Sequence, residues 1–201
     1  AAGGKYVSLG GAQPNPRDTK VYEGIELIRR EQVDFVLAVG GGSVVDSAKA
    51  IANGACYDGD VWDLFDGKGK NTEVLPLGTV VTIPAAGSEM SNSSVITREE
   101  DLCKRGRNTP LNFPKFSILN PEFTYTLPPF QTACGVVDIM AHMMERYFTR
   151  VTHVELIDRM TEGALKTVVG NAPIVIHEPE NYDARAEIMW AGCLAHNTLV
   201  Q

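Results

Sequence analysis

The most constraining feature of the sequence is an apolar run that ends in three glycines and continues as a helix. Residues 33–39 are almost continuously apolar, Gly40 to Gly42 follow, and residues 43–52 have helical spacing. Such a run is typical of a strand buried on both faces of a parallel sheet. Glycines let a backbone approach a ligand closely, and a helix N-terminus offers unpaired N–H groups to an anion such as a pyrophosphate. The unit therefore predicts a parallel α/β fold with an anion site at this bend.

The same bend has a second interpretation. Ser43 and Asp46 have the S-x-x-D spacing of a capping box, and glycines also permit a tight turn from strand to helix. The segment matches neither GxGxxG nor GxxxxGK[ST] literally. The residues alone leave a helix cap and a phosphate site equally open, and both can hold together because they use different N–H groups.

The order of the predicted elements indicates two domains. We expect a helix over residues 17–31 and strands over residues 5–9, 33–39, 79–83, 94–98 and 115–119. The charged, turn-rich segment 99–114 is expected to be an exposed connection. After Pro128 and Pro129 only helical spacing remains, over residues 130–148, 154–169 and 183–199, with Pro173 and Pro179 as breaks. The prediction is an α/β domain over residues 1–127 and an all-helical domain over residues 128–201.

Composition excludes some classes of protein. The 201 residues carry a formal net charge of −7, which disfavours binding to a nucleic-acid backbone. No apolar run reaches 18 residues, so no transmembrane helix or membrane partner is expected, and the first residues lack the pattern of a signal peptide. The four cysteines form no CxxC pair, which favours reduced thiols in a cytoplasmic protein.

A carboxylate and an imidazole stand four residues apart in a segment that is otherwise apolar. Asp138 and His142 would lie on one face of a helix, within reach of one divalent metal ion such as Fe²⁺, Zn²⁺ or Mn²⁺. A local helix pair is the alternative, and this spacing alone favours it. Of the other histidines, His153 and His177 are expected at the surface or in a loop, and His196 on an apolar helix face.

Four stretches in a fixed order resemble the iron-containing alcohol dehydrogenase family, in particular its butanol-dehydrogenase-like branch. The stretches are Gln13–Pro16, the GGGSVVDSAKA segment from Gly40 to Ala50, the segment Thr82–Glu89, and Pro121–Pro128 followed by Asp138 and His142. The resemblance covers essentially the whole chain. It implies a dinucleotide-binding α/β domain with a parallel sheet flanked by helices, followed by an all-α domain.

The resemblance also implies a set of site residues. Contacts with the cofactor pyrophosphate would come from Gly41, Gly42, Ser43 and Asp46, contacts near the diphosphate and nicotinamide from Thr82 and Ser88, and further cofactor contacts from Lys104 and Thr126. Members of the family hold their metal with one aspartate and three histidines. Asp138 and His142 match the first two ligands of an iron ion, with zinc as the alternative.

The chain departs from the family pattern in several places. Ala86 stands where threonine is frequent, and Asn120 where aspartate is usual. The last two metal histidines of the family would lie beyond Gln201, and family members begin with a further strand and helix. We therefore expect an internal fragment, with its first strand missing and its helical domain incomplete, that does not turn over alcohols by itself.

The implied activity is hydride transfer between a primary alcohol and NAD(P), with NADP slightly favoured by the branch. The expected partners are a small alcohol or aldehyde and further copies of the chain in a homodimer or larger oligomer. A related glycerol-type dehydrogenase or dehydroquinate-synthase-like enzyme remains an alternative, as does a non-catalytic nucleotide-binding fragment.

Overall fold

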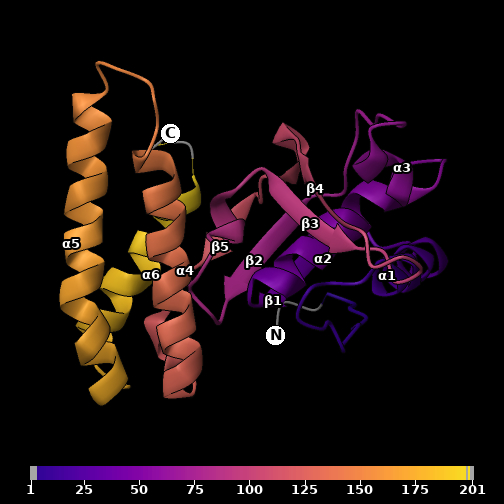
Figure 1. Cartoon of the computed structure of the whole chain (residues 1–201). Coiled ribbons are helices and arrows are strands. Elements are labelled where there is room, and N and C mark those ends of the chain that lie inside the picture. The colour runs from indigo at the N-terminus through magenta and orange to yellow at the C-terminus, as the bar shows by residue number, and fades with distance from the viewer. Residues whose placement is uncertain (1–3, 198, 200–201) are drawn as a thin grey trace.

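The computed structural model describes residues 4–197 and 199, which form an α/β part and a helical part (Figure 1). The α/β part contains α1 (Asp18–Glu31), β1 (Val36–Gly40), α2 (Gly42–Ala55), α3 (Val61–Asp66), β2 (Leu77–Val81), β3 (Ser93–Thr97), β4 (Lys104–Asn108) and β5 (Phe116–Ile118). The helical part contains α4 (Pro129–Tyr147), α5 (Glu155–His177) and α6 (Tyr182–His196). Short 3₁₀ helices are η1 (Ser88–Met90), η2 (Pro110–Asn112) and η3 (Pro121–Thr124).

The parallel sheet predicted from the sequence is confirmed. Its strands lie in the order β1-β2-β5, and both neighbouring pairs are parallel, with Ala38 opposite Thr79 and Thr79 opposite Ser117. Helix α2 packs on β1 and β2 with one side and on β3 with another. Its residues from Ser47 to Gly54 are consequently all buried, which makes α2 the central helix of the α/β part.

The expectation that the strand over residues 33–39, which is β1, is buried on both faces was wrong. Ala38 is 2% exposed, whereas Phe35, Leu37 and Val39 are 37%, 52% and 57% exposed. Alternate side chains of a strand point to opposite faces. Helix α2 covers the Ala38 face, and no described element covers the Leu37 face to the same extent.

Three other local predictions were wrong. Residues 5–9 form no strand, and the segment expected to be a plain connection contains β4, which pairs antiparallel with β3. Helix α5 continues through Pro173, which was expected to break it. Strand β4 reads Lys-Arg-Gly-Arg-Asn, a sequence with little strand propensity, so the pairing with β3 rather than its own composition makes it a strand.

The helical part is built as expected, from three helices that lie side by side at one end of the molecule (Figure 1). Its core includes Ile139 and Met143 of α4, Val168 and Val175 of α5, and Ile188 of α6, all nearly inaccessible to solvent. No helix among the described residues is long and apolar enough to cross a membrane.

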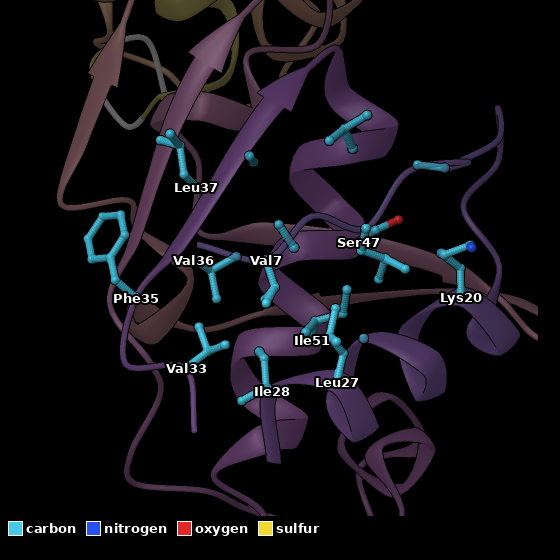
Figure 2. A pocket seen from close by; sticks show the side chains of 16 residues that line it. Val7, Lys20, Leu27, Ile28, Val33, Phe35, Val36, Leu37, Ser47 and Ile51 are labelled. Carbon is cyan, nitrogen blue, oxygen red and sulfur yellow. The ribbon is translucent and has the colours of Figure 1, made fainter. Parts of the chain in front are cut away.

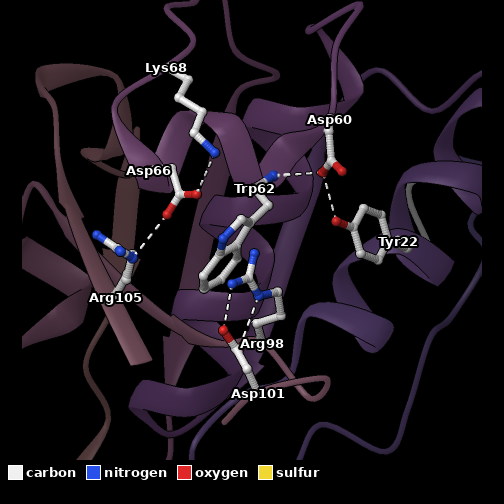
Figure 3. A network of polar contacts seen from close by, with 8 residues as sticks. All are labelled: Tyr22, Asp60, Trp62, Asp66, Lys68, Arg98, Asp101 and Arg105. Atoms are coloured by element: carbon white, nitrogen blue, oxygen red, sulfur yellow. Dashed lines mark hydrogen bonds and ion pairs between the residues drawn. The ribbon is translucent and has the colours of Figure 1, made fainter. Parts of the chain in front are cut away.

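Polar contacts fix the short helix α3 in place (Figure 3). Asp60 caps α3 by accepting a hydrogen bond from the Trp62 N–H at 2.8 Å, and it also accepts one from the Tyr22 hydroxyl of α1 at 2.6 Å. The Arg98 guanidinium lies 4.9 Å from the Trp62 ring centroid and is held by Asp101. Helix α3 is therefore anchored both to α1 and to the segment that follows β3.

A small apolar hollow lies between α1, β1 and α2 (Figure 2). Its volume is about 160 Å³, and its lining includes Val7, Ile28, Val36 and Ile51. Apolar side chains dominate this lining, and none of the three glycines of the bend from Gly40 to Gly42 belongs to it.

Candidate functional site

The glycine bend leads from β1 into α2 without a side-chain cap. Gly41 is the N-cap residue, and no side chain accepts a hydrogen bond from the first turn, so the predicted capping box of Ser43 and Asp46 was wrong. The N–H groups of Val44 and Val45 both donate to the Gly41 carbonyl, at 3.0 and 3.2 Å. The first N–H groups of a helix have no acceptor within it, so those of Gly42 and Ser43 are available to an anion.

The three glycines of the bend differ in what a side chain would contact at each position. A Cβ on Gly40 would lie 2.5 Å from Cγ2 of Val44, and one on Gly41 would lie 3.1 Å from Cδ1 of Ile83. A Cβ on Gly42 would meet nothing within 4 Å. The first two glycines thus allow close packing of the bend, and the third leaves the helix N-terminus open.

Asp46 turns away from the helix terminus and ties α2 to the segment after β2. One carboxylate oxygen accepts from the Ser88 hydroxyl at 2.6 Å, and the other accepts from the Val95 N–H at 3.0 Å. Burial raises the pKa of Asp46, and Ser88, Lys49 and Val95 oppose this shift. The carboxylate therefore has protein donors on both of its oxygens.

Lys49 lies one helical turn after Asp46 and is 0% exposed. Its ammonium donates to the Ser88, Ser91 and Ser93 carbonyl oxygens at 2.6, 2.8 and 2.7 Å, and to the Ser88 hydroxyl at 3.1 Å. Burial lowers the pKa of Lys49 to about 8, while Asp46 and Glu89 act in the opposite direction. Sequence reasoning missed this residue, although a lysine among the small apolar residues of α2 was a visible signal.

The turn between β2 and η1 lies against the helical part at backbone contact. A Cβ on Gly87 would come within 2.5 Å of the Gly192 carbonyl of α6, and one on Gly135 of α4 would come within 2.4 Å of the Pro84 carbonyl. Next to this contact, the buried Cys193 thiol of α6 donates to the Glu89 carboxylate at 2.9 Å. The absence of side chains at these glycines lets α4 and α6 pack closely against the turn that follows β2.

Asp138 and His142 occupy one face of α4, as their spacing predicts. The distance from Asp138 Oδ1 to His142 Nε2 is 3.8 Å, too long for a hydrogen bond. The Nδ1 atom of His142 is buried without a hydrogen-bond partner, and the Glu145 carboxylate is 3.8 Å from it. Two donors that each bind an ion at about 2.1 Å can lie up to about 4 Å apart, so this pair fits a shared divalent metal.

His196 of α6 lies beside this pair. The centroids of the His142 and His196 rings are 5.0 Å apart, and the rings meet edge to face. An arginine only donates, so the 3.2 Å contact from Arg146 to Nδ1 of His196 leaves the proton of the neutral ring on Nε2. Burial, followed by the charge of Arg146, lowers the pKa of His196 to about 4. The ring is therefore neutral at physiological pH.

One cavity of about 650 Å³ brings the two halves of the predicted site together. Six of the eight predicted cofactor residues line it, and so do both predicted metal ligands: Gly41, Gly42, Ser43, Asp46, Ser88, Lys104, Asp138 and His142. Thr82 and Thr126 are outside this lining; the Thr82 N–H donates to the Gly40 carbonyl at 3.1 Å, and Thr126 is exposed after η3. His196 and Gln131, which the sequence did not single out as site residues, also line the cavity.

The loop before α1 closes one side of the cavity. Gln13, Pro14, Asn15 and Pro16 all line it, and Asn15 accepts a hydrogen bond from the Lys104 ammonium of β4 at 2.9 Å. The Gln13–Pro16 stretch and the glycine bend therefore line the same cavity, although they are about 25 residues apart in the sequence.

Comparison with known families gives two matches that together span most of the chain. Residues 1–121 match the family model described as iron-containing alcohol dehydrogenase. Residues 132–200 match the C-terminal model of the Fe-containing alcohol dehydrogenase family.

Individual relatives agree with these matches. A probable NADH-dependent butanol dehydrogenase of Bacillus subtilis is 47% identical over 99% of this chain and 51% of its own length. An NADPH-dependent aldehyde reductase of Escherichia coli is 41% identical over 96% of this chain and 51% of its own. The crystal structure of an NADH-dependent butanol dehydrogenase from Thermotoga maritima superposes with a TM-score of 0.94 at 42% identity, covering 96% of this chain and 48% of that one. The chain thus spans about half the length of each relative.

Proposed function

The chain belongs to the iron-containing alcohol dehydrogenase family, and on that premise we propose that the protein catalyses reversible hydride transfer between a primary alcohol and NAD(P). The observation that carries the proposal is the shared cavity. An open helix N-terminus with free N–H groups lines it from the α/β part, and a carboxylate–imidazole pair lines it from the helical part. Hydride transfer requires the dinucleotide and the substrate to meet, and a cavity lined from both parts would hold them together.

The cofactor diphosphate is proposed to bind the N–H groups of Gly42 and Ser43, where the positive end of the α2 dipole favours an anion. Lys104 also lines the cavity and would supply a positive charge to the cofactor. Ser88 and Asp46 contribute to the wall next to it, and Thr82 fixes the backbone of the bend through the Gly40 carbonyl. Thr126 remains a predicted contact that lies outside the cavity lining.

Asp138 and His142 are proposed to hold Fe²⁺, with Zn²⁺ as the alternative ion. When bound, the ion supplies Lewis acidity at the substrate oxygen, and the nicotinamide ring supplies the hydride chemistry. Within the described residues no group of three or more His, Cys, Asp or Glu side chains could hold a metal. Two donors bind a metal far more weakly than four, so we propose that these 201 residues alone bind the cofactor but do not turn over alcohols.

The remaining side chains shape the reaction space. Arg146 donates to the backbone carbonyl of His142 at 2.9 Å and contacts Nδ1 of His196 at 3.2 Å, so it orients the His196 imidazole. The neutral His196 ring presents an N–H group, and no positive charge, beside Asp138 and His142. Ile83 and Ala85 form an apolar wall of the same cavity, which limits water near the reacting atoms.

The choice between NAD and NADP and the class of alcohol are more specific parts of the proposal. Of the three relatives described above, two are named as NADH-dependent and one as NADPH-dependent, so we propose NAD(P) and keep the slight preference for NADP as a prediction from the sequence. Small primary alcohols and their aldehydes are the proposed substrates. A cytoplasmic location and a homodimer or larger oligomer are also proposals, the latter testable by sedimentation.

Two assays test the proposal. NADH and NADPH fluorescence titrations of the 201-residue chain, with and without Fe²⁺ under anaerobic conditions, should show cofactor binding. The complete gene product should consume NADH or NADPH with butanal and lose this activity on chelation. Turnover of glycerol or of a sugar-acid phosphate in preference to butanal would favour a glycerol-type dehydrogenase or a dehydroquinate-synthase-like enzyme. Cofactor binding with no turnover of any substrate would favour a non-catalytic nucleotide-binding protein.

A further inference from the structure

We propose that Asp46 and Lys49 form a positioning pair that builds the anion-binding wall of the cavity and neutralises its charge, rather than contacting the cofactor directly. The inference rests on the proposed function, because it assigns the reason why a diphosphate is accepted beside a carboxylate. A carboxylate that lines an anion site is otherwise unfavourable, since like charges repel.

The geometry of Asp46 argues against a direct contact with the cofactor. An ionised carboxylate only accepts hydrogen bonds, so it cannot donate to a phosphate oxygen. Both of its oxygens already have protein donors, the Ser88 hydroxyl and the Val95 N–H. Its backbone carbonyl accepts a third bond, from the Ser94 hydroxyl at 3.0 Å. Every described polar contact of Asp46 beyond α2 thus goes to the segment between Ser88 and Val95.

Lys49 binds the same segment, Ser88 to Val95, from the side that faces away from the cavity. The three carbonyl groups that accept from its ammonium belong to Ser88, Ser91 and Ser93, and each of these serines lines the cavity. Lys49 itself does not line it and is inaccessible to solvent. The ammonium therefore acts on a ligand through the position of the wall and through its charge, not by contact.

Among the charged groups around the pair, Lys49 is the buried cation that balances the negative charge of Asp46. Glu89 of η1 is a second buried carboxylate that acts on Lys49, and it is paired with the Cys193 thiol of α6. Lys104 of β4 also acts on Asp46, but it is exposed and bonded to Asn15. Removing the Lys49 charge would leave the half-buried Asp46 carboxylate, which lines the cavity, without the ammonium that balances it.

This assignment predicts opposite effects for the two members of the pair. Lys49→Met should weaken NADH binding by at least about tenfold, because an uncompensated carboxylate then faces the anion. Asp46→Asn should tighten it by about threefold, since an amide can still accept from Val95 and donate to Ser88 while the wall gains net positive charge. The double variant Asp46→Asn/Lys49→Met should recover most of the loss of the single Lys49 variant.

The experiment is isothermal titration of the 201-residue chain and its three variants with NADH, with ADP-ribose and with uncharged adenosine, with circular dichroism to confirm folding. A charge effect should change the affinities for NADH and ADP-ribose and leave that for adenosine within about twofold. A merely structural role would change all three alike.

Several outcomes would overturn the inference. One is a folded Lys49→Met variant that binds NADH as the unmodified chain does, and another is a double variant no better than the single one. If Lys49→Met does not fold, Asp46→Asn decides: weaker NADH binding would show that Asp46 contacts the cofactor. An unmodified chain that binds neither NADH nor ADP-ribose would instead refute the proposed cofactor site itself.

Discussion

At the scale of single residues, the glycines of the bend have different roles: two allow close packing, and one is proposed to leave room for the cofactor. Gly42 is the one glycine of the three whose Cβ would project into open space. Gly42→Ala should therefore leave the free energy of unfolding unchanged or slightly raised, and should weaken NADH binding by about tenfold because the methyl group stands where the diphosphate approaches. Fluorescence titration and urea denaturation of the same variant measure the two effects.

Gly170→Ala is the matched control for this variant. Gly170 lies within α5, and a Cβ there also meets nothing within 4 Å. It should raise the free energy of unfolding by about 0.5–1 kcal/mol and leave NADH binding unchanged. An equal effect of both variants on binding would show that Gly42 does not face the cofactor.

Gly87 is one of the glycines on which the contact between the two parts depends. Its φ of 67° lies in the left-handed region, and a Cβ would fall 2.5 Å from the Gly192 carbonyl. Gly87→Ala should lower the free energy of unfolding by about 2–4 kcal/mol, since the strained φ and the clash add. Chemical denaturation tests this, and a loss below about 0.5 kcal/mol would mean that the turn moves freely away from α6.

The sequence predicted the residues whose chemistry is local and missed those that act across the chain. The free N–H groups follow from the glycine run, and the Asp138–His142 face follows from helical spacing. The hydrogen bonds of Lys49 could not be predicted in this way, because its acceptors lie about 40 residues further along the chain. The capping-box interpretation was wrong for the same reason, because the Asp46 carboxylate accepts hydrogen bonds from Ser88 and Val95, which are far away in the sequence.

At the scale of elements, helix α3 depends on its N-cap. Asp60 accepts from the Trp62 N–H and from the Tyr22 hydroxyl (Figure 3). Asp60→Ala should reduce the free energy of unfolding by about 1–2 kcal/mol through loss of the cap. The exposed Asp58, for which the structure gives no side-chain hydrogen bond, provides the control: Asp58→Ala should change stability by less than about 0.5 kcal/mol. Equal losses would argue against the cap.

Elements with a strong pattern of their own were predicted, and those formed by pairing were not. The periodic helices α1, α4 and α6 begin and end within a few residues of their predicted limits. Strand β4 and the six-residue α3 were missed, because each is stabilised mainly by its partners in the folded chain. The exposed face of β1 shows the opposite error, since an apolar run alone does not say how many of its faces are covered.

At the scale of the whole molecule, the site exists only because the two parts meet. No local pattern places Gly41 next to His142, which are about 100 residues apart in the sequence. The family resemblance implied a cofactor contact for Gly41 and a metal ligand for His142, and one cavity is lined by both. The physical basis of the contact is the glycine-rich packing of the Pro84–Gly87 turn on α4 and α6.

The most direct test is a crystal structure of the protein grown with NADH and with Zn²⁺ in place of oxygen-sensitive Fe²⁺. The diphosphate should lie against the N–H groups of Gly42 and Ser43, and the metal should contact Asp138 and His142 in the same cavity. A cofactor bound in the apolar hollow beside Val36, or a metal held away from α4, would contradict the account.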